Sequence, residues 1–129
     1  MKTIKLTILA LIISTFCYSQ SYNKISKCVF IKYDGTQWVD KDVNYPEKIF
    51  VILNHNEVSI TNEAQTKIIT YGDAEKKKYE DGEVSMWDAY DGDGKNCVFM
   101  MKYFYGTRTI VYTLAYLKQG YGFQYYSNH

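Results

Sequence analysis

The sequence has little of the residues on which most catalytic and metal sites depend. It contains two histidines, His55 and His129, and three cysteines in 129 residues. No cysteines and histidines stand at zinc-finger spacing, and neither a glycine-rich phosphate loop nor a nucleophile elbow is present. Cys28 with His55 is the one nucleophile–base pair that the composition offers, and His55 sits in a turn-like run of asparagines. We therefore predict no catalytic residue, no metal and no cofactor.

The chain also lacks an excess charge of one sign and a long apolar run. The formal net charge is +1, too small for a domain that binds nucleic acid or an anionic membrane through its overall charge. The longest mostly apolar stretch, residues 6–16, falls short of the roughly 20 residues that span a bilayer. We expect no nucleic-acid partner and no stable membrane insertion.

Residues 1–19 have the pattern of a signal peptide. Lys2 and Lys5 precede the apolar stretch, and Cys17-Tyr18-Ser19 places small side chains at the −3 and −1 positions of a cleavage site. Cleavage before Gln20 would export a single domain, residues 20–129, to the periplasm or the extracellular space. The alternative is a lipoprotein anchored through Cys17, but Phe16 stands where a lipid-attachment motif has a small residue.

Export would leave two cysteines, Cys28 and Cys97, each within a strand-like segment. An even pair in an oxidising compartment predicts a disulfide.

Short β-branched and aromatic segments separated by turn residues dominate the rest of the chain. They predict an all-β, single-domain antiparallel meander of about eight to nine short strands. A meander of this size removes its edges by curling into a small barrel; a two-sheet sandwich is the alternative. Residues 72–82 alone have a helical composition, and either a short helix or a solvated loop fits them.

Residues 83–117 predict three consecutive strands, around which the rest of the domain packs. Asp-Gly occurs twice at 91–94 and predicts a two-residue turn, and Gly106 predicts a second. Turns of this length place one set of side chains on the core face; an odd-length loop would exchange the faces. The predicted core face comprises Val84, Met86, Asp88, Tyr90, Cys97, Phe99, Met101, Tyr103, Ile110, Tyr112, Leu114 and Tyr116.

The opposite face of these strands gives the candidate binding surface. Trp87, Met100 and Val111 would form an apolar patch there, either covered by residues 20–25 or 73–81 or open to a partner. Asp88 would be the one charge on the core face. It is either a ligand-contacting acid inside a barrel or a carboxylate at the rim that hydrogen-bonds a tyrosine.

Tyrosine is the compositional outlier, with fourteen copies. Its apolar body and polar tip suit a recognition surface. We therefore expect an exported, non-catalytic binding or interaction module for a protein or glycan partner. The alternative is a calycin-like barrel that holds a small apolar ligand, which rests on analogy of fold alone; an enzyme is third. The sequence does not indicate an oligomeric state.

Overall fold

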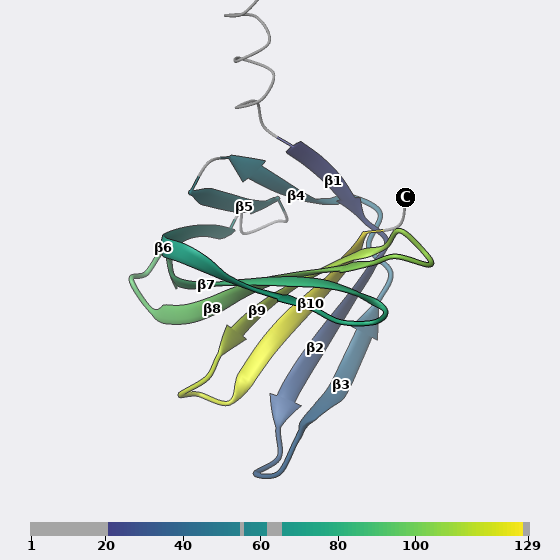
Figure 1. The fold of residues 1–129 in the computed structure, drawn as a ribbon. Coiled ribbons are helices and arrows are strands. Elements are labelled where there is room, and N and C mark those ends of the chain that lie inside the picture. Colours follow the sequence, from purple (N-terminus) through teal and green to yellow (C-terminus); the bar gives the residue numbers. More distant parts are fainter. Residues whose placement is uncertain (1–20, 55, 62–65, 128–129) are drawn as a thin grey trace, which may run out of the picture.

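Ten strands form one antiparallel sheet that curls into a half-barrel (Figure 1). The computed structural model describes residues 21–54, 56–61 and 66–127, so the predicted signal peptide, Cys17, His55 and His129 lie outside the described residues. The all-β prediction is confirmed. The sheet is a half-barrel, neither the small closed barrel that we expected nor the alternative two-sheet sandwich, and the described residues form ten strands rather than eight to nine. They are β1 (Ser21–Ile25), β2 (Lys27–Tyr33), β3 (Trp38–Asn44), β4 (Ile49–Asn54), β5 (Glu57–Thr61), β6 (Thr66–Lys78), β7 (Gly82–Asp91), β8 (Asn96–Phe104), β9 (Ile110–Tyr116) and β10 (Tyr121–Ser127).

The predicted meander is correct for β4 to β10, which pair in sequence order. The first three strands depart from it, because β1 pairs with β4 at one edge while β2 pairs with β10 and carries β3 at the other. Ser26 alone separates β1 from β2, and its N–H donates to the Tyr126 carbonyl at 2.8 Å. This short connection draws the two ends of the curled sheet together.

The concave face of the sheet holds the core. Phe99, Tyr112 and Leu114 are almost completely buried there. Trp87 packs against this cluster, with its ring centroid 5.9 Å from that of Phe99. The fully or largely buried members of the cluster are Ile25, Val51, Val58, Ile60, Ile68, Ala89, Cys97, Phe99, Tyr112, Leu114, Tyr116 and Tyr125.

Aromatic side chains extend this face across β9, β10 and β2. The ring centroids of Tyr116 and Tyr121 lie 5.0 Å apart, and those of Phe30 and Phe123 lie 5.4 Å apart. The tyrosine-rich character that the composition predicted thus appears as packed aromatic clusters.

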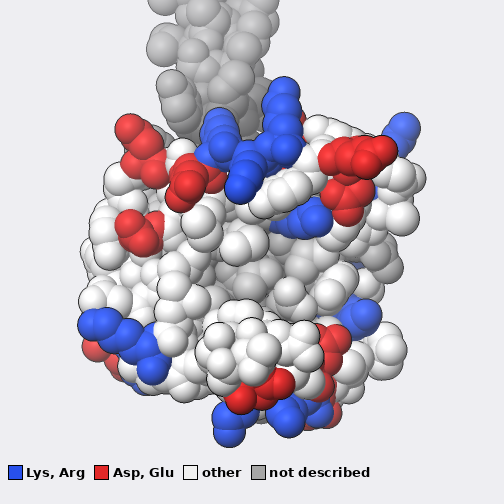
Figure 2. Space-filling view, turned by 60° about the horizontal axis from the view of Figure 1, so that its bottom comes forward, with Lys and Arg blue, Asp and Glu red and all other residues white. Residues whose placement is uncertain are grey.

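Figure 2 shows charged side chains of both signs around the rim of one side of the molecule, whose middle is uncharged and hollowed.

The turn between β7 and β8 differs from the predicted two-residue turn. The Asp91 N–H donates to the Lys95 carbonyl at 3.0 Å, which leaves a loop of residues 92–94. The Gly94 N–H donates to the Asp91 carbonyl at 2.9 Å, and Gly94 has a φ of 78°. A three-residue loop that ends on a left-handed glycine is a common hairpin connection. The Asp91 side chain reinforces it by accepting from the N–H groups of Asp93 and Lys95.

This odd-length loop exchanges the faces of β7. Trp87 pairs with Phe99 and Met86 pairs with Met100, so Trp87 points to the core and Asp88 is exposed on the outer face. The predicted core positions Val84, Met86, Asp88 and Tyr90 were therefore wrong, because a shift of one residue moves a whole strand to the other face.

The faces of β8 and β9 are as predicted. Met101 pairs with Tyr112, and Phe99 pairs with Leu114. The connecting loop spans residues 105–108 rather than two residues, since the Phe104 N–H donates to the Thr109 carbonyl at 2.9 Å. Arg108, at a φ of 56°, takes the left-handed position. A loop of four residues is still even, so the faces are preserved.

The predicted disulfide is not formed. Cys28 and Cys97 are both free thiols, and β10 and β9 lie between their strands in the sheet. Three strand spacings of about 4.8 Å separate the two positions along the sheet, whereas a disulfide joins Cα atoms less than about 7 Å apart. The segment with helical composition is also a strand, because β6 continues to Lys78 through a bulge after Tyr71.

The face of β7 can be tested with two neighbouring substitutions. Trp87→Ala should lower the free energy of unfolding by about 2–4 kcal/mol, since it removes a large side chain from the core. Asp88→Ala on the exposed face should change it by less than about 0.5 kcal/mol. Chemical denaturation of both variants measures the two losses. A larger loss of stability in Asp88→Ala than in Trp87→Ala would instead support the two-residue turn, in which Asp88 faces the core.

The Asp91 carboxylate makes the stability depend on pH. The Tyr116 hydroxyl donates to Asp91 Oδ2 at 2.7 Å. Burial opposes ionisation of Asp91, but the hydrogen bonds from Tyr116 and from the N–H groups of Lys95 and Asp93 outweigh it, so its pKa is lowered. A carboxyl whose pKa is lower in the folded state stabilises the fold above its unfolded pKa and loses this contribution as the pH falls through the folded value.

We expect Asp91→Asn to melt at a lower temperature than the wild type at pH 7. The gap should close in strongly acidic solution, where the wild-type carboxyl is also protonated. Thermal melts from pH 7 down to pH 2 test this, with Asp93→Asn as the control because the side chain of Asp93 is exposed. A gap that stays constant over this range would show that the charge of Asp91 is not responsible.

Candidate functional site

Three lysines lie in one row across the outer face of the sheet. The register pairs each position with the next, from β6 through β7, β8, β9 and β10 to β2. We call these six positions the lysine row. In order they are Lys77, Val84, Lys102, Val111, Tyr126 and Lys27.

Each lysine of the row lies over an aromatic ring. The Nζ of Lys27 is 4.5 Å from the ring centroid of Tyr126, and that of Lys102 is 4.6 Å from Phe104 and 5.4 Å from Tyr79. Lys77 lies 5.8 Å from Tyr79. An ammonium over a ring face gains electrostatic attraction, while its aliphatic stem covers apolar surface. The positive charges of the row therefore lie over aromatic rings, and Val84 and Val111 lie between the lysines.

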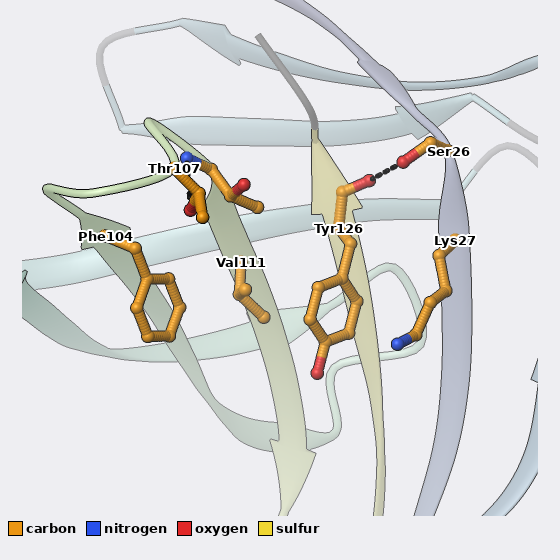
Figure 3. Close-up of a pocket in the computed structure, with 7 residues that line it drawn as sticks. Ser26, Lys27, Phe104, Thr107, Val111 and Tyr126 are labelled. Carbon is orange, nitrogen blue, oxygen red and sulfur yellow. Dashed lines mark hydrogen bonds between the residues drawn. The ribbon is translucent and has the colours of Figure 1, made fainter.

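A groove of about 380 Å³ opens beside one end of this row. Figure 3 shows the side chains of Phe104 and Tyr126 on either side of Val111, with Lys27 alongside Tyr126. Val111 is 6% exposed and forms the floor. We call this site the outer groove; it is lined by Ser26, Lys27, Phe104, Thr107, Thr109, Val111 and Tyr126.

Hydrogen bonds between hydroxyl groups and the backbone stabilise two sides of the groove. The Ser26 hydroxyl donates to the Tyr126 carbonyl at 3.3 Å, beside the bond from its own N–H. On the opposite side, the Thr109 N–H donates to the Thr107 hydroxyl at 3.4 Å. The groove thus joins the β1–β2 connection, the end of β10 and the loop between β8 and β9.

Lys27 is the charged side chain among those that line the outer groove, and Lys102 and Lys77 continue the row beyond it. Among the described residues, Lys27 and Lys77 form no ion pair, and Lys102 Nζ lies 3.5 Å from Asp81 Oδ2 at the surface. Burial, and secondarily the charge of Asp40, raises the pKa of Tyr126. Tyr126 therefore stays a neutral phenol, and its hydroxyl donates to Gln124 Oε1 at 3.4 Å.

The structure divides the four predicted site residues between the two faces. Val111 lies in the outer groove, and Met100 lies on the same face beside Thr113. Asp88 is also on the outer face, where it lines a second cavity of about 200 Å³. Trp87 packs into the core on the other face, so the predicted patch of Trp87, Met100 and Val111 does not exist.

Sequence reasoning missed most of the groove. Lys102 and Phe104 alternate with the predicted core positions Met101 and Tyr103, which places them on the opposite face. Nothing in the chain indicated that Lys27 and Tyr126 would lie beside them. These residues come from the two ends of the domain and meet only through the pairing of β10 with β2.

The other chemistry of the described residues is sparse. They contain no group of three or more His, Cys, Asp or Glu side chains arranged to hold a metal ion. Burial, and to a lesser degree Asp91, raises the pKa of Cys97 to about 11, while burial and then Asp42 raise that of Cys28. Both thiols are therefore protonated near neutral pH and are poor nucleophiles. The described part also has no helix long and apolar enough to cross a membrane.

No protein-family model, curated protein or solved structure matches this chain.

Because the row is at the surface, its lysines should be replaceable without unfolding the domain. Lys27→Gln and Lys102→Gln each remove a contact between a cation and a ring, and Lys102→Gln also removes an exposed ion pair. Such contacts contribute about 1 kcal/mol or less at exposed sites. Denaturant titration should therefore give unfolding free energies within about 1 kcal/mol of the wild type. A larger loss would show that these lysines are needed for the stability of the fold.

Proposed function

We propose that the protein is an exported, non-catalytic binding module that takes a glycan or protein partner in the outer groove. The observation that carries the proposal is the pair of rings, Phe104 and Tyr126, held on either side of the apolar Val111 with an ammonium group over each ring. Aromatic rings with polar tips and cations are the side chains that dominate recognition surfaces.

One further observation supports binding over catalysis. Burial raises the pKa of both thiols, which keeps them protonated. An enzyme therefore remains the third possibility. The export step of the proposal rests on residues 1–19, which have the charged start, apolar stretch and cleavage site of a signal peptide.

The packing of the concave face favours surface binding over the calycin-like alternative. Phe99, Tyr112 and Leu114 belong to one core cluster on this face and are at most 2% exposed. A carrier of a small apolar ligand would need a pocket of several hundred Å³ at such positions.

The test is to present residues 20–129 to arrays of glycans and to the proteins of the native envelope or medium. The double variant Phe104→Ala/Tyr126→Ala should lose about tenfold or more in affinity for whatever the wild type retains, since it removes both walls of the groove. Tyr90→Ala is the matched control, because Tyr90 is an exposed tyrosine at the far end of β7.

Thermal melts of the same variants separate folding from binding. Undiminished binding by a folded double variant would exclude the outer groove as the site. Loss of binding in Tyr90→Ala alone would move the site to the other end of the outer face, where Tyr71 stacks on Tyr90 at 6.1 Å.

A further inference from the structure

We propose that the outer groove and the lysine row bind an acidic polysaccharide, a chain of sugar rings that carry carboxylates. This inference rests on the proposed binding function and specifies its ligand. The chain would run across the strands, from Lys27 on β2 over Lys102 to Lys77 on β6, with its sugar rings against the aromatic rings between them.

The spacing of the lysines suits a polymer that lies across the sheet. With strands about 4.8 Å apart, the three strand steps from Lys27 to Lys102 span about 14 Å and the two steps from Lys102 to Lys77 span about 10 Å. Phe104 and Tyr126 lie in the first interval. Tyr79 lies near Lys102 and Lys77 in the second.

The chemistry of the surface matches the two kinds of group on an acidic sugar. The apolar faces of a sugar ring can stack on Phe104 and Tyr126, above the floor formed by Val111. The hydroxyls of Thr107 and Thr109 at the rim can exchange hydrogen bonds with sugar hydroxyls. The ammonium groups of the row can form charge-assisted hydrogen bonds to the carboxylates.

Nucleic acid and acidic peptide fit the same surface less well. A nucleic-acid strand has a phosphate about every 3.4 Å along its helix axis. This is a denser line of charge than one carboxylate per sugar ring, so three lysines would neutralise a smaller share of it. A peptide that bound by strand addition would need free backbone groups. At the row, β7, β8, β9 and β10 are paired on both sides, which uses those groups in the ladder. Within the described strands, only the two end positions of the row, Lys77 and Lys27, are paired on one side alone.

One acidic group competes with the ligand at the middle of the row. Asp81 lies 3.5 Å from the ammonium of Lys102, and its side chain is 61% exposed. An exposed pair of this kind contributes at most about 1 kcal/mol, so a ligand carboxylate can displace it at little cost. Asp40 also acts on the groove, since its charge contributes to the raised pKa of Tyr126.

The experiment measures binding of fluorescent polygalacturonate to residues 20–129, with the methyl-esterified polymer as the uncharged version of the same chain. The wild type should bind the acid form, more weakly as salt increases. The triple variant Lys27→Gln/Lys77→Gln/Lys102→Gln should bind the acid form about tenfold or more weakly than the wild type does. The wild type should bind the methyl-esterified polymer as weakly as the triple variant binds the acid form. The control is Lys32→Gln/Lys95→Gln/Lys118→Gln, which removes three exposed lysines at the opposite ends of the strands.

Several results would overturn the proposal. They are no binding of polygalacturonate by the folded wild type, equal losses in the two triple variants, and equal affinity for the ester. Tighter binding of oligothymidylate or polyglutamate, with the same lysine dependence, would assign the row to nucleic acid or to an acidic peptide instead.

The failure of this inference is distinguishable from that of the proposed function. A neutral glycan or a protein whose binding requires Phe104 and Tyr126 but none of the three lysines would leave the binding function intact and exclude the acidic polysaccharide. If the Phe104→Ala/Tyr126→Ala variant bound every partner normally, both proposals would fail. Thermal melts of each variant ensure that the losses refer to folded protein.

Discussion

The length of the loop between β7 and β8 is the constraint on which the arrangement of both faces depends. Three residues, closed by a left-handed Gly94 and by the side chain of Asp91, set the register of β7 against β8. With one residue fewer, Asp88 would point into the core and Trp87 into solvent. Burial of an unpaired carboxylate costs several kcal/mol, so the observed register is the one in which both side chains find suitable surroundings. It also places Val84 next to Lys102 and thereby continues the lysine row to β6.

The outer face shows how a sheet can keep apolar side chains on its solvent side. Val29, Ile31 and Val111 face outward and are at most 6% exposed. Lysine and tyrosine have long apolar bodies with polar ends, so they cover such positions while their charged or hydroxyl groups remain in water. Lys27 over Tyr126 beside Val111 is an example. A ligand that replaced this cover would bury apolar surface without requiring the core to change, so the proposed binding site is compatible with a stable fold.

Sequence reasoning succeeded where the signal is local. The alternation of β8 and β9 depends on neighbours two residues apart, and it correctly assigned Phe99, Tyr112 and Leu114 to the core. It failed at residues 72–78, where a helical composition is overridden by pairing of β6 with β7, and at Cys28 and Cys97, where an even cysteine count carries no information on which strands are neighbours. Of the candidate site, Val111 was identified, and Lys27 and Tyr126 were not.

The sequence by itself determined the all-β class, the positions of the main turns and the abundance of tyrosine, because strand propensity and turn chemistry depend on residues close together in the chain. Only the tertiary structure decided which face of β7 is buried, that the thiols of Cys28 and Cys97 remain apart, and that Lys27, Lys102 and Lys77 form a row. These features depend on loop parity and on strand order, above all on the pairing of β10 with β2. That pairing joins residues about 100 positions apart, and it is specified by the packing of the whole half-barrel rather than by any local pattern.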